Sequence, residues 1–245
     1  MKRSHRSMSR RIGRFTLDRR LLVLLLLAAL FVGARAWLAE HPEHNPWAPL
    51  DLRDPLGWAT ARKLQALRED VDDCRAVLGR SEVAFSFLPA AGAGECARPD
   101  RTRLDRFPFA PAPPPTTCAV AVGLELWRRT TLDRQAQALF GHGVARVEHL
   151  GAFSCRRMYG RGEGAWSEHA TGNAVDIAAI VLDDGTRIGV FADWDGDDPK
   201  KTLFLRRVRD GACQAFATVL SPDYNAAHRD HLHFDMAARW GGVCR

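Results

Sequence analysis

The chain has 245 residues, 46% of them hydrophobic and 26% charged, with a formal net charge of +6. Residues 1–20 alone hold eight Lys and Arg side chains against one acid, Asp18, so the rest of the chain is slightly acidic. A basic excess confined to one tail argues against a globular domain that binds nucleic acid. The length allows one sizeable domain with appendages.

An uncharged apolar run, residues 21–34, follows the basic tail, and after Arg35 the run continues to Ala39. One interpretation is a cleavable signal peptide. Its cleavage triplet would be residues 34–36, in which alanines lie on both sides of Arg35. The other is a membrane anchor over 21–39, with Arg35 reaching the far interface. We favour the anchor because an arginine occupies the middle of the cleavage triplet. Either interpretation exports residues 40–245.

Six cysteines follow the apolar run, and none forms a CxxC pair. An even number of cysteines in an exported domain predicts three disulfides and argues against a zinc-thiolate site. We expect Cys213 to pair with Cys244 and the others to pair locally. The others are Cys74, Cys96, Cys118 and Cys155.

The first half of the exported part is predicted to be mainly helical. Residues 40–55 have the composition of a linker, and helical spacing of apolar residues over 54–79 predicts a helix that ends at Gly79. Residues 89–117 are rich in Pro and Gly and predict a loop. Residues 118–141 predict a helix followed by a second short one.

Strands dominate the second half, with one inserted helix over 202–220. A hairpin turn at Asp183-Asp184-Gly185 separates two of the strands. The predicted strands begin at Val144 and cover 173–182, 186–194 and 231–237. Helices followed by strands favour an α+β fold with a mostly antiparallel sheet, flanking helices and disulfides, after one N-terminal transmembrane or signal segment. The predicted parts are a basic cytoplasmic tail (1–20), the anchor or signal (21–39), the linker (40–55) and the domain (56–245).

The segment SEHATGNAVDI, residues 167–177, contains a candidate metal-binding pair, His169 and Asp176. A turn at Gly172 followed by a strand can bring both side chains to one point. On that strand Asp176 shares its face with alanines, while Val175 and Ile177 take the other face. A carboxylate there is costly to bury unless it is paired or bound to a cation.

The segment HRDHLHFD, residues 228–235, supplies further candidates. His231 and His233 are two residues apart and point to the same face of a strand. Either of them, together with the first pair, gives two nitrogens and one carboxylate oxygen. This is a ligand set for a catalytic zinc with an open fourth position. Asp235 could orient a ligand histidine.

These motifs resemble the zinc D-Ala-D-Ala carboxypeptidase and murein endopeptidase superfamily, and most of all its extensin-like C-terminal branch of bacterial exported proteins. The resemblance covers about residues 50–245. It implies Zn²⁺ as cofactor, with His169, Asp176 and His233 as its ligands. The matching phrases are SCR, SEHATGNAVDI, DW, FLR…AC and YNAAHRDHLHFD.

The resemblance also implies roles around the metal. Ser167 and His228 match residues at the substrate site, and Arg156 matches an arginine that holds substrate or the developing oxyanion. The base is either Asp230, where carboxypeptidase relatives carry a glutamate, or His231, as in endopeptidase relatives. Aspartate is shorter than glutamate, and on an ideal strand Asp230 faces away from the metal unless the strand begins with a turn.

The implied function is hydrolysis of peptide bonds in peptidoglycan stems or cross-links. Carboxypeptidase and endopeptidase action both remain open. A non-catalytic peptidoglycan-binding or scaffold protein is the alternative, and a protease acting on exported proteins is a third reading. The expected partners are peptidoglycan peptides and, through residues 21–39, the membrane, with no nucleic acid. The domain is expected in the bacterial periplasm, held by a single-pass inner-membrane anchor or released if residues 1–36 are cleaved.

Overall fold

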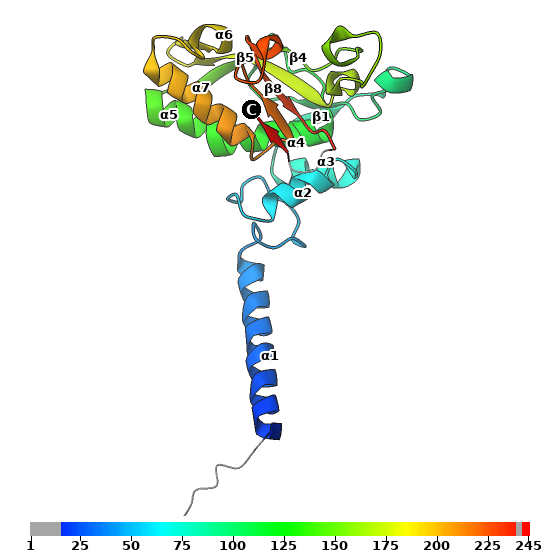
Figure 1. The fold of residues 1–245 in the computed structure, drawn as a ribbon, viewed down its shortest axis with the longest axis vertical. Coiled ribbons are helices and arrows are strands. Elements are labelled where there is room, and N and C mark those ends of the chain that lie inside the picture. The colour runs from blue at the N-terminus through cyan, green and yellow to red at the C-terminus, as the bar shows by residue number, and fades with distance from the viewer. Residues whose placement is uncertain (1–15, 239–241) are drawn as a thin grey trace, which may run out of the picture. The chain divides into compact units, whose positions relative to one another are not determined.

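The computed structural model describes residues 16–238 and 242–245. The chain divides into two compact units, Met1–His41 and Pro42–Arg245. Within the first unit, α1 (Thr16–Glu40) is one uninterrupted helix (Figure 1). Its 22 residues Arg19–Glu40 are long and apolar enough to cross a membrane, as in an anchor or a signal sequence. Of the predicted basic tail, 1–20, residues 1–15 lie outside the described residues.

The predicted single helix over 54–79 is wrong, because the structure contains two helices there. They are α2 (Thr60–Ala66) and α3 (Val71–Arg80). The side chain of Asp70 accepts a hydrogen bond from the N–H of Asp73 and so begins a new helix. The apolar residues that suggested one helix are nevertheless buried, as Leu67 and Leu78 show.

The region 89–117, predicted to be a loop, contains two short strands. β2 (Thr102–Leu104) pairs antiparallel with β1 (Phe85–Phe87), and β3 (Phe109–Ala110) joins the main sheet. Thr102 and Leu104 are buried while Arg103 between them is not, which is the alternation of a strand. The surrounding Pro and Gly residues conceal this three-residue signal in the sequence.

The main sheet has the strand order β3-β4-β5-β8-β7-β9, and β6 also pairs with β5. The pairs β3–β4 and β7–β9 are parallel, and the other four pairs are antiparallel. The predicted α+β fold with a mostly antiparallel sheet is therefore confirmed. The strand bounds are β4 Val144–Gly151, β5 Ala174–Leu182, β6 Arg187–Gly189, β7 Thr218–Leu220, β8 Leu232–Asp235 and β9 Val243–Cys244.

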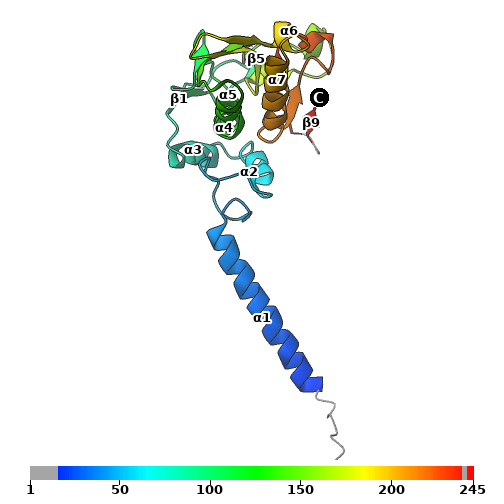
Figure 2. The same cartoon turned by 90° about the vertical axis from the view of Figure 1, so that its left-hand side faces the viewer.

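Three helices pack against one face of this sheet: α4 (Cys118–Trp127), α5 (Asp133–Phe140) and α7 (Pro199–Ala212). In Figure 2, α7 lies beside the continuous helix that α4 and α5 form. A π-helical stretch, 128–132, joins α4 to α5 without a break. The ring of Trp127 packs edge-on against Phe234 of β8, with centroids 5.2 Å apart. Because side chains alternate along a strand, the residues next to Phe234 point to the opposite face.

Two predicted elements are shorter than expected. The strand over 186–194 ends at Gly189 and is followed by α6 (Val190–Asp193). The helix over 202–220 begins earlier, at Pro199 after the capping Asp198, and ends at Ala212. Its predicted last turn is instead strand β7, which occupies the sheet between β8 and β9. This correction matters because β7 borders the candidate site.

Three disulfides hold the second unit together. The predicted Cys213–Cys244 bridge is confirmed and ties β9 to the end of α7. The expectation of local pairing is wrong, since Cys74 pairs with Cys118 and Cys96 with Cys155, at sequence separations of 44 and 59. Packing of α3 on α4 brings the first pair together, and the turns at 94–96 and 168–171 lie next to each other near the second.

Candidate metal centre

Local structure brings His169, Asp176 and His233 together on the sheet face opposite the helices. We call these three residues the His–Asp–His group. His169 lies in a 3₁₀ turn, Glu168–Thr171, which Ser167 caps and which Gly172 ends with a left-handed φ of 73°. Asp176 of β5 is the antiparallel partner of His233 on β8, so their side chains share one face.

The three donor atoms of the group lie close to one another. His169 Nε2 is 3.2 Å from Asp176 Oδ1 and 3.1 Å from His233 Nδ1. His233 Nδ1 is 2.9 Å from Asp176 Oδ1. His169 and His233 are only 4% and 8% exposed, and the Asp176 side chain is 14% exposed.

Hydrogen bonds on the outer side of each histidine fix which ring nitrogen faces the group. His169 Nδ1 donates to the carbonyl oxygen of Ala152 at 3.2 Å, and His233 Nε2 donates to Asp235 Oδ2 at 3.0 Å. In neutral rings the inner nitrogens then carry lone pairs. Two lone pairs and a carboxylate cannot stay this close in a buried place without a cation between them.

The donor set fits a divalent metal ion. Ligands of a tetrahedral zinc ion at its usual bond lengths lie about 3.3 Å apart, close to the separations observed here. Metal-binding histidines in proteins commonly donate their second N–H to a carboxylate or a backbone carbonyl, as both do here. The His–Asp–His group could therefore hold a metal ion.

The carboxylate of the group is held in its charged form. Burial alone would raise the pKa of Asp176, but its close contacts with the imidazoles of His169 and His233 outweigh burial and lower the pKa well below its usual range. Burial would likewise lower the pKa of His233, but hydrogen bonds to Asp176 and Asp235 raise it to about 9. At neutral pH, without a metal ion, the cation between the donors is a proton on His233.

His231 and Asp230 precede β8, which begins only at Leu232. His231 Nε2 is 3.5 Å from Asp176 Oδ1, and its Nδ1 donates to Asp230 Oδ1 at 2.8 Å. Asp230 lies behind His231, with 49% of its side chain exposed. A turn does precede the strand, as a contact of Asp230 with the metal would require, but Asp230 contacts His231 instead.

The remaining predicted residues border the same pocket, of about 340 Å³. Ser167 caps the turn that carries His169. His228 is buried, and this burial, together with the nearby His231 and His233, lowers its pKa to about 4. Its Nδ1 donates to Asn225 Oδ1 at 2.8 Å. Arg156 is exposed at the pocket wall, and no ion pair holds it among the described residues.

The pocket also contains side chains that the sequence did not single out as site residues. Tyr159 lies in the wall with a left-handed φ of 57°, rare for a residue other than glycine, and its hydroxyl is 3.4 Å from Asn225 Nδ2. Thr218 and Leu220 of β7 and Val243 of β9 extend the pocket along the sheet. Sequence patterning missed the two β7 residues because it assigned them to a helix.

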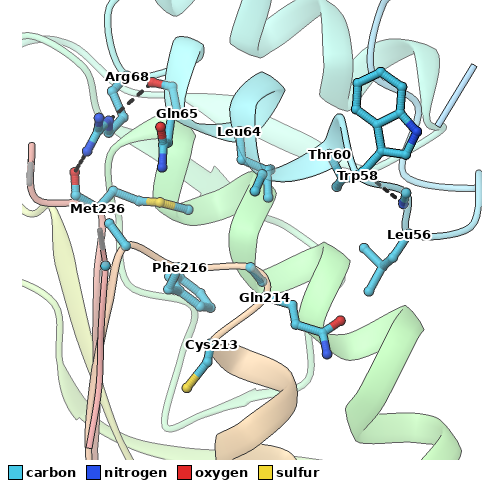
Figure 3. A pocket seen from close by; sticks show the side chains of 15 residues that line it. Leu56, Trp58, Thr60, Leu64, Gln65, Arg68, Cys213, Gln214, Phe216 and Met236 are labelled. Carbon is cyan, nitrogen blue, oxygen red and sulfur yellow. Dashed lines mark hydrogen bonds between the residues drawn. The ribbon is translucent and has the colours of Figure 1, made fainter. Parts of the chain in front are cut away.

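A second pocket, of about 440 Å³, has few charged or titratable side chains among its described lining residues. It is lined by α2 and by the chain after α7, as Figure 3 shows. Arg68 is the one charged side chain among its described lining residues. Its guanidinium donates to the carbonyl oxygens of Gln65 and Met236 (Figure 3), and also to that of Ala237. Arg68 therefore stabilises the chain segment that follows β8, and we assign it a structural role.

A second cluster of metal-ligand types lies at the hairpin between β5 and β6. It consists of His142, Asp183 and Asp184, which we call the surface group. His142 Nδ1 is 2.7 Å from Asp183 Oδ1, and Asp183 Oδ2 accepts from the N–H of Gly143. The Asp183 and His142 side chains are 58% and 42% exposed. The sequence predicted a turn here, and the structure contains that turn.

Comparison with known families identifies the chain. The family described as "Extensin-like protein C-terminus" matches residues 72–245, more than two thirds of the sequence. The chain belongs to this family. No curated protein and no solved structure matches it. The extensin-like domain thus contains all three disulfides and the entire His–Asp–His group.

Proposed function

We propose that this extensin-like protein is an exported zinc-dependent peptidase that hydrolyses peptide bonds of peptidoglycan stems or cross-links. The observation that carries the proposal is the His–Asp–His group, whose histidines are held from behind and whose donor atoms face a pocket. Two nitrogens and one carboxylate form a ligand set that favours zinc and leaves a position for water or substrate. When bound, zinc lowers the pKa of water and polarises a carbonyl group.

His231 is the proposed general base. Its Nδ1–H is held by Asp230, so Nε2 carries the free lone pair and lies beside Asp176. This places the accepting atom next to the group at which a nucleophilic water would be generated. Asp230 is assigned a positioning role, because it contacts His231 and is directed to its outer side.

Arg156 and His228 are the proposed substrate contacts. Arg156 is exposed at the pocket wall, where its guanidinium can bind a peptide carbonyl oxygen or a carboxylate. His228 is neutral near pH 7, and with Nδ1 donating to Asn225 its Nε2 can accept a hydrogen bond. Ser167 acts by holding the turn of His169 and lines the pocket.

The substrate is inferred from the compartment. An N-terminal apolar helix and three disulfides indicate an exported protein. We place the domain in the periplasm, held by α1 as an inner-membrane anchor, where peptidoglycan supplies peptides. The pocket is large enough for a few residues of such a peptide.

The direct test is digestion of purified muropeptides by the zinc-loaded protein, followed by mass spectrometry. We expect new peptide fragments with the wild type and none with His169→Ala, whereas His142→Ala in the surface group should cleave normally. Binding of muropeptides without cleavage by the wild type would overturn the peptidase proposal and favour a non-catalytic peptidoglycan-binding protein. The masses of the fragments separate carboxypeptidase from endopeptidase action.

A further inference from the structure

We propose that Thr218, Leu220 and Val243 form a substrate subsite beside the metal group, which takes a peptide residue with a small uncharged aliphatic side chain. We call these three residues the edge subsite. The inference rests on the proposed peptidase function and adds the kind of residue that the pocket selects. It follows from strand register, from an unpaired hydroxyl and from the apolar side chains of Leu220 and Val243 among the described residues at this end of the pocket.

Strand register places the edge subsite on the same sheet face as the His–Asp–His group. Leu220 of β7 is the cross-strand partner of His233, and Thr218 is the partner of both Asp235 on β8 and Val243 on β9. Directly paired residues point to the same face of a sheet. The row that holds the metal ligand His233 therefore continues into Leu220, and the row of Asp235 continues into Thr218 and Val243.

The hydroxyl of Thr218 provides an independent sign of a ligand. Thr218 is 2% exposed and lines the pocket, yet its Oγ1 has no hydrogen-bond partner among the described residues. Asp235, its cross-strand neighbour, does not contact this hydroxyl, and its two oxygens accept from His233 Nε2 and from the N–H of Ala237. A buried hydroxyl normally has a partner, since leaving it unpaired costs about 1–3 kcal/mol. A peptide group of the substrate can supply that partner.

The neighbours of Thr218 define the side chain that fits. Leu220 and Val243 are half-buried and apolar, so they offer contact to a methyl or a short branched group. Among the described residues, Asp235 is the one charged residue paired with the edge subsite, and each of its oxygens already accepts a hydrogen bond. Arg156, at the pocket wall, lies on the loop before the His169 turn and not on β7 or β9. A charged substrate side chain would lose its water at the edge subsite without gaining a partner.

The test compares Thr218→Val with wild type in the full-length, zinc-loaded protein. The probes are a peptidoglycan-type pentapeptide that ends in two alanines and analogues with lysine or phenylalanine at each alanine. We expect Thr218→Val to raise KM for the alanine peptide about three- to tenfold with little change in kcat, which is the usual effect of losing one neutral hydrogen bond. Thr218→Ser should restore KM, and the wild type should reject the lysine analogues.

A matched control separates binding from folding. Thr102 is also fully buried, but its Oγ1 donates to Asp100 at 2.9 Å, far along the chain from the pocket. We expect Thr102→Val to lower the melting temperature and leave KM unchanged, and Thr218→Val to leave the melting temperature unchanged or raised. A lowered melting temperature with unchanged KM for Thr218→Val would assign its hydroxyl to structure and overturn the edge subsite.

Failure of the edge subsite and failure of the peptidase proposal remain distinguishable. If the wild type cleaves none of the peptides, their dissociation constants are measured by calorimetry in place of KM. The same weakening by Thr218→Val is then expected for binding. Equal affinity of the two proteins, or the absence of any binding to the wild type, would overturn the edge subsite.

Discussion

The His–Asp–His group and the surface group contain the same residue types, yet they differ in how their histidines are held. Both clusters bring a histidine and carboxylate oxygens within 4.8 Å of one another. In the His–Asp–His group, a backbone carbonyl and Asp235 bind the outer nitrogens of the two histidines. In the surface group, His142 directs Nδ1 to Asp183 and Nε2 to Asp184, so both of its nitrogens already face carboxylates.

This difference has a physical consequence. Water can hydrate the exposed carboxylates of the surface group, and ion pairs between exposed groups contribute little. In the His–Asp–His group, burial removes the hydration of Asp176, and the hydrogen bonds to the carbonyl of Ala152 and to Asp235 direct the histidine lone pairs inward. Residue types alone therefore do not distinguish a metal site from a polar turn. The two clusters are distinguished by what binds the outer nitrogen of each histidine ring.

The largest expected effect comes from removing one donor of each cluster. His169→Ala should reduce zinc affinity by at least about a thousandfold, since a ligand and its preorganised geometry are both lost. His142→Ala should leave the affinity unchanged. Zinc competition against a chromophoric chelator measures both variants. Equal losses in the two variants would show that the surface group also binds the ion and would remove the contrast between the clusters.

The next largest effect is expected at Asp235, whose carboxylate accepts from the outer nitrogen of His233. Asp235→Asn keeps the size of the side chain but weakens the acceptor for His233 Nε2–H. We expect zinc affinity to fall about 10–100-fold, again measured by chelator competition. Asp184→Asn is the control and should have no effect. An unchanged affinity in Asp235→Asn would show that the sheet alone orients His233.

Much of the His–Asp–His group was predictable because its members lie where sequence patterns are strong. Asp176 interrupts an apolar strand, and His233 follows His231 at strand spacing close to the C-terminus. The role of Asp230 depended on the backbone turn before β8, whose geometry no side-chain period encodes. Its contact with His231 therefore required the structure.

The fold was predictable to a similar extent. Long periodic elements such as β5 and α4 follow the predicted ranges. Short elements do not, because three residues carry too little periodicity to separate a strand from a helix end. β7 is the important case, since the helix prediction over 202–220 absorbed Thr218 and Leu220. The break between α2 and α3 depended on one capping residue, Asp70.

The pH dependence of metal binding gives a further test of the buried group. The pKa of His233 is raised to about 9, so below that pH the metal-free site holds a proton that the metal ion must displace. Zinc affinity should therefore rise with pH by up to about tenfold per unit from pH 7 and level off above about pH 9. Chelator competition over this range, corrected for the chelator, measures the slope. A flat profile would contradict a proton held between Asp176 and Asp235.

The smallest expected effect concerns two similar histidine–aspartate pairs, one in each region. Asp230 accepts from His231 Nδ1 at 2.8 Å, and Asp183 lies 2.7 Å from His142 Nδ1. Asp230→Asn should lower kcat for muropeptide cleavage by about three- to tenfold, because the amide is a weaker acceptor for His231 Nδ1–H and fixes its tautomer less firmly. The effect stays modest because half of the Asp230 side chain is exposed and water can replace the carboxylate.

Zinc affinity separates the two roles that Asp230 could have. A carboxylate that only positions His231 leaves zinc affinity unchanged when it becomes an amide, while kcat falls. Asp183→Asn should change neither quantity, although its hydrogen-bond geometry is nearly the same. A loss of activity above a thousandfold in Asp230→Asn would instead make Asp230 the base. The two pairs differ in what the second histidine nitrogen faces: His231 Nε2 lies beside Asp176 of the His–Asp–His group, so we expect only this pair to affect cleavage.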